Sequence, residues 1–327
     1  MRRTDLNSHK YHWGNISAFL ALTFLLMAAF PTRSAAQQQG QKTFASAEEA
    51  SQSLFAAAQS NDTKALLEIL GPDGKEIVNS GDDNEDAQSR SMFVQHYQEM
   101  HRLVKEPDGS VTLYIGAANW PCPIPIVNKG SIWYFDTDAG KKEILYRRVG
   151  RNEMSAIHVL QQLVAAQKEY FSSQHNEYAQ KLFSDEGKHD GLYWKAAPGE
   201  PESPIGPQVA KAVAHGYANI EDTDRIPYRG YFFHVVTRQG KEAPGGAKNY
   251  IVNGKMTDGF AFIAYPAEYR SSGVMTFMVG PDGVVYQKDL GKKSIFKALA
   301  IKEFNPDAKW AKAVEEPTQT AGEKPAK

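Results

Sequence analysis

The stretch Asn152–Phe183, NEMSAIHVLQQLVAAQKEYFSSQHNEYAQKLF, has the clearest helical periodicity in the sequence. Its apolar residues recur at helical spacing and share one face: Ile157, Leu160, Leu163, Val164, Tyr170 and Phe171. Asn152 is a suitable N-cap, and Gly150 before it interrupts whatever precedes. Strand-like runs lie on both sides, at 111–136 and 228–288. We therefore predict one amphipathic helix over 152–183 that is covered by two separate sheets.

The residues before this helix, 44–150, predict a helical α+β domain. Helices are expected from Ser46, from Asp62 and over 89–104. Strands are expected at 110–116, 123–128 and 131–136, and a short basic helical turn at 141–149. On the 89–104 helix, His101 is predicted to share an apolar face with Phe93 and Tyr97.

Residues 151–311 predict a second domain, in which the long helix packs on an antiparallel sheet. The expected strands are 229–237, 249–253, 259–265, 273–279 and 284–288. Helices are expected near 207–215 and over 293–300. The fold class is thus α+β in both halves, and the composition of residues 312–327 predicts a disordered tail.

The first 36 residues have the pattern of a secretory signal peptide. A basic start is followed by the apolar run Ile16–Phe30 and by Ser34-Ala35-Ala36, a small-residue cleavage pattern. The apolar run is short for an uncleaved transmembrane anchor. We expect cleavage near Ala36, a polar linker over 37–43, and a periplasmic or extracellular protein.

Charge and cysteine content exclude several classes of protein. The net charge of the chain is −1, and it is about −4 once residues 1–36 are removed, so no strong field attracts nucleic acid or an anionic membrane. We therefore expect no nucleic-acid partner, and no membrane partner after signal cleavage. The single cysteine, Cys122, excludes an intrachain disulfide, and we interpret it as a small buried apolar residue.

Distinctive segments along most of the chain resemble one protein family. They include NWPCPIPIV (119–127), DGLYW (190–194), GEPESPIGP (199–207), YRGYFFHVVT (228–237) and YIVNGKMTDGFAFIAYPAEYR (250–270). The chain resembles, from Phe44 to Trp310, an exported bacterial family of unknown function, domain of unknown function 2950. The resemblance implies no activity. Cys122 departs from the pattern, which has an aromatic residue there.

Two further resemblances concern shape alone. The first half is similar to nuclear-transport-factor-2-like domains, whose curved sheet encloses a pocket. The second half is similar to the soluble part of type IV pilins, in which a long helix packs on a sheet. The pilin cleavage motif is missing, so polymerisation does not follow from this resemblance.

Motifs for metals and cofactors are absent from the sequence. The chain has no H-E-x-x-H and no paired C-x-x-C, and its nine histidines are scattered. Gly291-Lys292-Lys293-Ser294 is similar to the end of a phosphate-binding loop, but Tyr286 stands where the first glycine belongs. We expect neither a metal site nor a cofactor.

The candidate site residues form two groups. In the first half, His101 could act as a general base oriented by Asp136 in a pocket beside Trp133; the alternative is a core histidine bonded to a backbone carbonyl. In the second half, the candidate binding residues are His234, Tyr265, Glu268 and Tyr269. His234, in the centre of its predicted strand, could face either solvent or a cleft. The other three residues could form a recognition surface and are equally consistent with an ordinary exposed hairpin end.

Three functions remain open at this point. The leading hypothesis is a non-enzymatic envelope module that binds a small ligand or a protein partner, because strong catalytic and metal motifs are missing. The first alternative is an enzyme that uses the His101–Asp136 pair, and the second is a pilin-like assembly component. The sequence does not indicate the oligomeric state.

Overall fold

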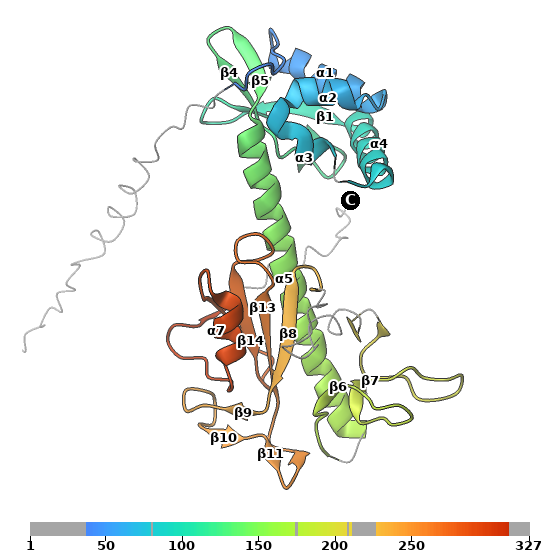
Figure 1. Cartoon of the computed structure of the whole chain (residues 1–327), viewed down its shortest axis with the longest axis vertical. Coiled ribbons are helices and arrows are strands. Elements are labelled where there is room, and N and C mark those ends of the chain that lie inside the picture. Colours follow the sequence, from blue (N-terminus) through green and yellow to red (C-terminus); the bar gives the residue numbers. More distant parts are fainter. Residues whose placement is uncertain (1–36, 80, 174–175, 208, 211–226, 314–327) are drawn as a thin grey trace, which may run out of the picture. The chain divides into compact units, whose positions relative to one another are not determined.

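The computed structural model describes residues 37–79, 81–173, 176–207, 209–210 and 227–313 (Figure 1). These residues form α-helices and mainly antiparallel sheets, which confirms the predicted α+β class. They divide into two compact units, residues 1–140 and 141–327. The predicted signal peptide, most of the predicted helix at 207–215 and nearly all of the predicted tail lie outside the described residues.

The first unit contains helices followed by a sheet. The helices are α1 (Ala47–Gln59), α2 (Thr63–Leu70), α3 (Lys75–Val78) and α4 (Asp83–Glu99), with a 3₁₀ turn at Pro72–Gly74. The strands are β1 (His101–Lys105), β2 (Val111–Ile115), β3 (Trp120–Pro121), β4 (Ile126–Lys129) and β5 (Ile132–Phe135). The strand order is β1-β2-β4-β5, all neighbours are antiparallel, and β3 pairs with β2.

The first two helices begin where the sequence predicts. The Ser46 hydroxyl accepts a hydrogen bond from the backbone N–H of Glu49 at 3.1 Å, and the Asp62 carboxylate accepts one from Ala65 at 2.9 Å. The Glu49 carboxylate in turn accepts from the backbone N–H of Ala45 at 2.8 Å. These bonds satisfy N–H groups that have no partner within a helix.

The prediction of a helix over 89–104 is wrong at its end. The helix stops at Glu99, Met100 is extended, and His101 opens strand β1 opposite Ile115. The backbone N–H of Gly116 donates to the carbonyls of His96 (3.0 Å) and Met100 (2.9 Å), so it provides partners for carbonyls at the helix end. The ladder with β2 then satisfies the backbone of the following residues better than another helical turn would.

The predicted linker at 37–43 is part of the folded unit. Gln41 is buried, and its side-chain amide donates to the carbonyls of Ile69 (3.1 Å) and Phe135 (2.8 Å). Phe44 pairs with Trp133 through two backbone hydrogen bonds of 2.9 Å. This segment therefore joins α2 to the sheet.

The second unit contains a long helix and a larger sheet. Its helices are α5 (Thr137–Ser173), which begins within the last residues of the first unit, and α7 (Ser294–Ala300). The main sheet contains the strands β8 (Tyr231–Val236), β13 (Ala261–Pro266), β14 (Met275–Val279), β15 (Val285–Asp289) and β16 (Ala311–Lys312). Their order across the sheet is β16-β15-β14-β13-β8. Smaller pairs are formed by β6 (Lys181–Phe183) with β7 (Gly191–Tyr193), β9 (Arg238–Gln239) with β10 (Lys248–Asn249), and β11 (Ile251–Val252) with β12 (Lys255–Met256).

The long helix exists, but both predicted ends are wrong. It begins at Thr137 and ends at Ser173, so the expected break at Gly150 and the N-cap at Asn152 both lie inside it. The predicted domain boundary near residue 150 also falls within this unbroken helix. Leu182, which we predicted to be helical, is buried in β6, a strand that pairs in parallel with β7.

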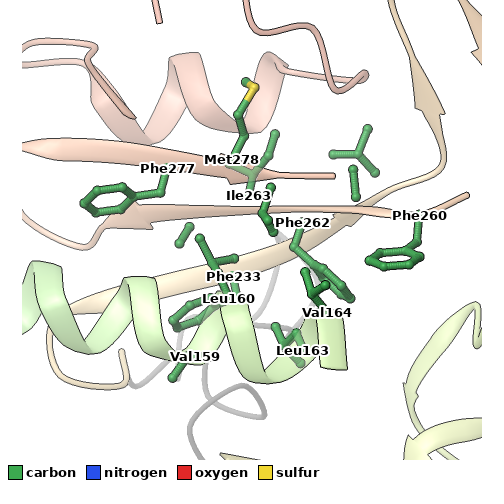
Figure 2. Close-up of a cluster of buried hydrophobic side chains, with 14 of the residues drawn as sticks. Val159, Leu160, Leu163, Val164, Phe233, Phe260, Phe262, Ile263, Phe277 and Met278 are labelled. Atoms are coloured by element: carbon green, nitrogen blue, oxygen red, sulfur yellow. The ribbon is translucent and has the colours of Figure 1, made fainter. Parts of the chain in front are cut away.

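One face of α5 forms the core of the second unit. Figure 2 shows Leu160 and Val164 pointing from the helix toward the strands that carry Phe233 and Phe262. Leu160, Phe233 and Phe262 are all fully buried. The helix is therefore fixed to this sheet by removal of apolar surface from water.

The expectation that two sheets cover this helix is wrong. The hydrophobic core of the first unit is made of residues between 44 and 135, none from α5, among the residues that the structure describes. The sheet of the second unit instead has helices on both faces: Figures 1 and 2 show α5 on one side and α7 on the other, where Met278 points. Each unit thus has its own core.

Polar contacts fix the start of β14 to α5. The Glu153 carboxylate accepts hydrogen bonds from the backbone N–H groups of Val274 (2.8 Å) and Met275 (3.0 Å), and the Asn152 amide donates to the carbonyl of Ser272 (2.9 Å). Burial, and then the nearby Glu153 charge, raises the pKa of the Tyr231 hydroxyl well above its usual range. That hydroxyl therefore stays protonated and donates to the carbonyl of Met275 at 2.8 Å.

A buried glutamine connects α5 to the chain that follows it. Gln167 is completely buried, its amide nitrogen donates to the carbonyl of Ala179 at 2.9 Å, and its amide oxygen accepts from the N–H of the same residue at 2.9 Å. The side chain thereby pairs with Ala179 as a neighbouring strand would.

Replacing Leu160 with alanine tests the packing of α5 on the sheet. Leu160 is 0% exposed, so we expect Leu160→Ala to lower the free energy of unfolding by about 2 to 5 kcal/mol. The exposed Lys168→Ala on the same helix is the control, with an expected change within about 0.5 kcal/mol. Chemical denaturation measures both, and equal small effects would contradict the packing.

Candidate functional site

The first unit contains a partly open cavity of about 860 Å³. Each of its four helices contributes apolar side chains: Leu54 and Ala58 from α1, Leu66 and Leu70 from α2, Ile77 and Val78 from α3, and Met92 and Phe93 from α4. The sheet and its loops add Ile115, Trp120, Cys122, Pro123, Ile124 and Phe135. A cavity of this size and lining is suited to a small apolar molecule.

Charged and polar side chains line the cavity along α4. Four of them recur at helical spacing on one face of this helix, Glu85, Ser89, His96 and Glu99, and Asp86 and Arg90 also line the cavity. The His96 Nδ1 lies 3.4 Å from the Glu99 carboxylate. The cavity therefore offers an apolar interior with polar groups gathered along one wall.

Arg90 on the same helix is held by its neighbours. Its guanidinium donates to the side-chain oxygen of Asn61 and, at 3.3 Å, to the carbonyl of Val78. These bonds tie α4 to the end of α1 and to α3. Arg90 thus contributes to the shape of the cavity wall.

His101 does not face the cavity. Its side chain is exposed at the start of β1, its Nδ1 lies 2.9 Å from the Tyr97 carbonyl, and its ring stacks on that of Tyr97 with centroids 4.0 Å apart. The bond to a backbone carbonyl agrees with the simpler of our two hypotheses, although the residue is not in the core. The apolar helix face predicted for His101 is wrong because the residue belongs to a strand.

Asp136 has a local structural role. It follows β5, and its carboxylate accepts a hydrogen bond from the N–H of Ala139 at 3.0 Å, which caps α5. Strands β1 and β5 stand at opposite ends of the order β1-β2-β4-β5, about 14 Å apart at ordinary strand spacing. The structure therefore does not bring His101 and Asp136 together.

Trp133 does not line the cavity either. It is half-buried in β5 and paired with Phe44.

The candidates in the second unit belong to the sheet and to a hairpin. His234 stands opposite Ile263, with its ring 5.7 Å from that of Tyr265. Tyr265 is 1% exposed, so it is a core residue and forms no surface with Glu268 and Tyr269. Glu268 is exposed, and the Tyr269 hydroxyl donates to the Asp289 carboxylate at 2.9 Å.

The described part of the chain was also compared with the requirements of a metal site and of a membrane-spanning helix. No group of three or more histidine, cysteine, aspartate or glutamate side chains there has a geometry that could hold a metal ion. No helix there combines the length and the hydropathy needed to cross a lipid bilayer.

The fold and the cavity define an α+β protein with a mainly apolar cavity in its first unit. The chain belongs to the family described as protein of unknown function (DUF2950), which matches residues 41–313. Neither a curated protein nor a solved structure matches the chain significantly.

Replacing Asp136 separates the capping hydrogen bond of its side chain from the effect of its charge. We expect Asp136→Ala to lower the free energy of unfolding by about 1 kcal/mol, because the N–H of Ala139 loses its acceptor. Asp136→Asn retains a capping oxygen, so its stability should stay near that of the wild type. Denaturant titration measures both, and an equal loss in the two variants would show that charge, not capping, matters.

Proposed function

We propose that the chain is an exported module that binds a small apolar molecule in the cavity of its first unit. The main support for this proposal is the cavity itself, which is about 860 Å³ in volume and is lined by apolar residues from four helices and the sheet. Binding sites for small molecules are commonly about 300 to 1,000 Å³ and mainly apolar. Export is supported by the signal-like residues 1–36.

The distribution of polar groups suggests the form of the ligand. An apolar body fits against side chains such as Leu66, Phe93 and Phe135, while a polar end would reach Ser89, His96 or Glu99 along α4. We therefore propose an amphiphilic ligand, with one polar end oriented toward this helix. A few directed polar groups in an apolar pocket are what orient a ligand.

The two shape resemblances are kept as proposals. A sheet covered by helices around an apolar cavity supports a nuclear-transport-factor-2-like first unit. A long helix on an antiparallel sheet supports a pilin-like second unit, although sharing a shape does not imply assembly. The separation of His101 from Asp136 removes the geometric basis for an enzyme that uses this pair.

A cavity-filling variant tests ligand binding. The probe is N-phenyl-1-naphthylamine, an uncharged aromatic amine whose fluorescence rises in apolar surroundings. Ala58 is buried and lines the cavity, whereas Ala56 is exposed on the same helix and does not. We expect Ala58→Phe to weaken probe binding at least about tenfold, because the new ring occupies the site, and Ala56→Phe to leave it unchanged.

The single cysteine provides an independent measurement. Cys122 lines the cavity and is the only thiol of the chain, so bound probe should slow its reaction with a small alkylating reagent. Equal probe affinity in Ala58→Phe and the wild type, or labelling of Cys122 unaffected by saturating probe, would contradict the proposal. Circular dichroism of each variant shows whether the fold is retained.

A further inference from the structure

The second unit has a separate cavity of about 470 Å³ on the α7 side of its sheet. Residues 301–305 form one wall and are held beside β9 by two backbone bonds: the N–H of Gly240 donates to Phe304 at 3.0 Å, and that of Phe304 donates to Arg238 at 2.9 Å. The Asn305 side-chain oxygen accepts from the N–H of Glu242 at 2.8 Å. This wall is therefore built by the fold and needs no ligand to form.

Positive charge dominates the lining of this cavity. Four cationic side chains line it, Arg238, Lys288, Lys297 and Lys302, against the one carboxylate of Glu303. Within the described part of the chain, only Arg238 of these four has a carboxylate nearby, with its Nε 3.9 Å from Glu303. The chain as a whole is close to neutral, so this excess is local.

Two of the lysines are positioned by their surroundings. The Lys297 ammonium donates to the carbonyl of Leu290 at 2.5 Å. The Lys288 ammonium lies 5.4 Å from the ring centroid of Trp310, a cation–π distance. Trp310, Leu290 and Ile301 give the same cavity an apolar part beside its charges.

We propose that this cavity binds the phosphate group of an anionic ligand and packs the ligand's apolar part against Trp310. A carboxylate carries one negative charge, whereas a phosphate monoester carries about 1.5 to 2 near neutral pH and three acceptor oxygens. Four cations with one acid are better matched by the phosphate. The site is distinct from the cavity of the first unit and does not rest on the function proposed for it.

Titration calorimetry with phenyl phosphate tests the site on the protein lacking residues 1–36. We expect the double variant Lys288→Gln/Lys302→Gln to raise the dissociation constant about tenfold, since each lost charge contact weakens binding a few-fold. The control Lys292→Gln/Lys309→Gln removes two exposed lysines that do not line the cavity and should change it less than about twofold. Chemical denaturation confirms that both variants are folded.

Related ligands separate the contributions of charge and ring. Benzoate, with one charge on the same ring, should bind more weakly than phenyl phosphate. Trp310→Ala should weaken the binding of phenyl phosphate more than that of inorganic phosphate, because both ligands lose the positioning of Lys288 but only phenyl phosphate also loses its contact with the indole. Equal binding of benzoate and phenyl phosphate would contradict the preference for phosphate.

The phosphate could belong to a soluble molecule or to a lipid headgroup, and vesicles distinguish the two sources. Phe296, 76% exposed on α7, would enter a bilayer but would not contact a soluble ligand. Sedimentation with phosphatidylglycerol vesicles that is lost in Phe296→Ala and in the cavity variant assigns a lipid. Binding of phenyl phosphate without vesicle binding assigns a soluble ligand. Absence of both, or equal weakening in the lysine control, would overturn the proposal.

Discussion

Burial of one face of α5 against β8, β13 and β14 is the interaction on which the second unit depends. Leu160 is completely removed from water there, and burying a side chain of this size contributes about 1.5 to 3 kcal/mol. The hydrogen bonds that Glu153 accepts at the start of β14 make this packing specific, because they fix which part of the strand contacts the helix. The cavity beside α7 is bounded by the opposite face of the same sheet, through Met278.

Four strands of the main sheet, β8, β13, β14 and β15, could be predicted from the sequence because their residues alternate or are continuously apolar between glycine-rich turns. The limits of α5 could not, because Gly150 predicts a break that the helix does not have. An isolated glycine costs a helix only about 1 kcal/mol relative to alanine, which a long helix tolerates. Gly140, in the first turn of α5, has a different role: a Cβ there would lie 2.6 Å from the Ile124 side chain. Sequence alone does not separate these two glycines.

The boundary between α4 and β1 shows a second limit of local patterns. Tyr97 and His101 stand four residues apart, as on a helix, and their rings do stack at 4.0 Å. The backbone between them is nevertheless extended at Met100, because residues of β2 and Gly116 provide hydrogen bonds from elsewhere in the chain. Hydrogen bonds between segments distant in the sequence thus determine whether residues 100–104 are helix or strand, which the spacing of apolar residues does not determine.

The candidate sites were harder to predict than the fold for the same reason. The cavity of the first unit is lined by residues between Leu54 and Phe135, and no short motif contains them. The polar wall of the cavity is formed by α4. The side chains that α4 presents to the cavity include Met92 and Phe93 among charged residues, so the sequence of this helix shows no clear amphipathic pattern. The predicted pair of His101 and Asp136 failed because two strands separate its members.

The amide of Gln167 restricts which side chains this buried position can accept. A side chain there must donate a hydrogen bond to the carbonyl oxygen of Ala179 and accept one from the N–H of the same residue. The glutamine amide has both groups, on a side chain long enough to reach them. A carboxylate would set oxygen against oxygen, and an ammonium would set hydrogen against hydrogen, without water to mediate. Loss of the amide at position 167 would therefore remove both hydrogen bonds that hold Ala179 beside α5.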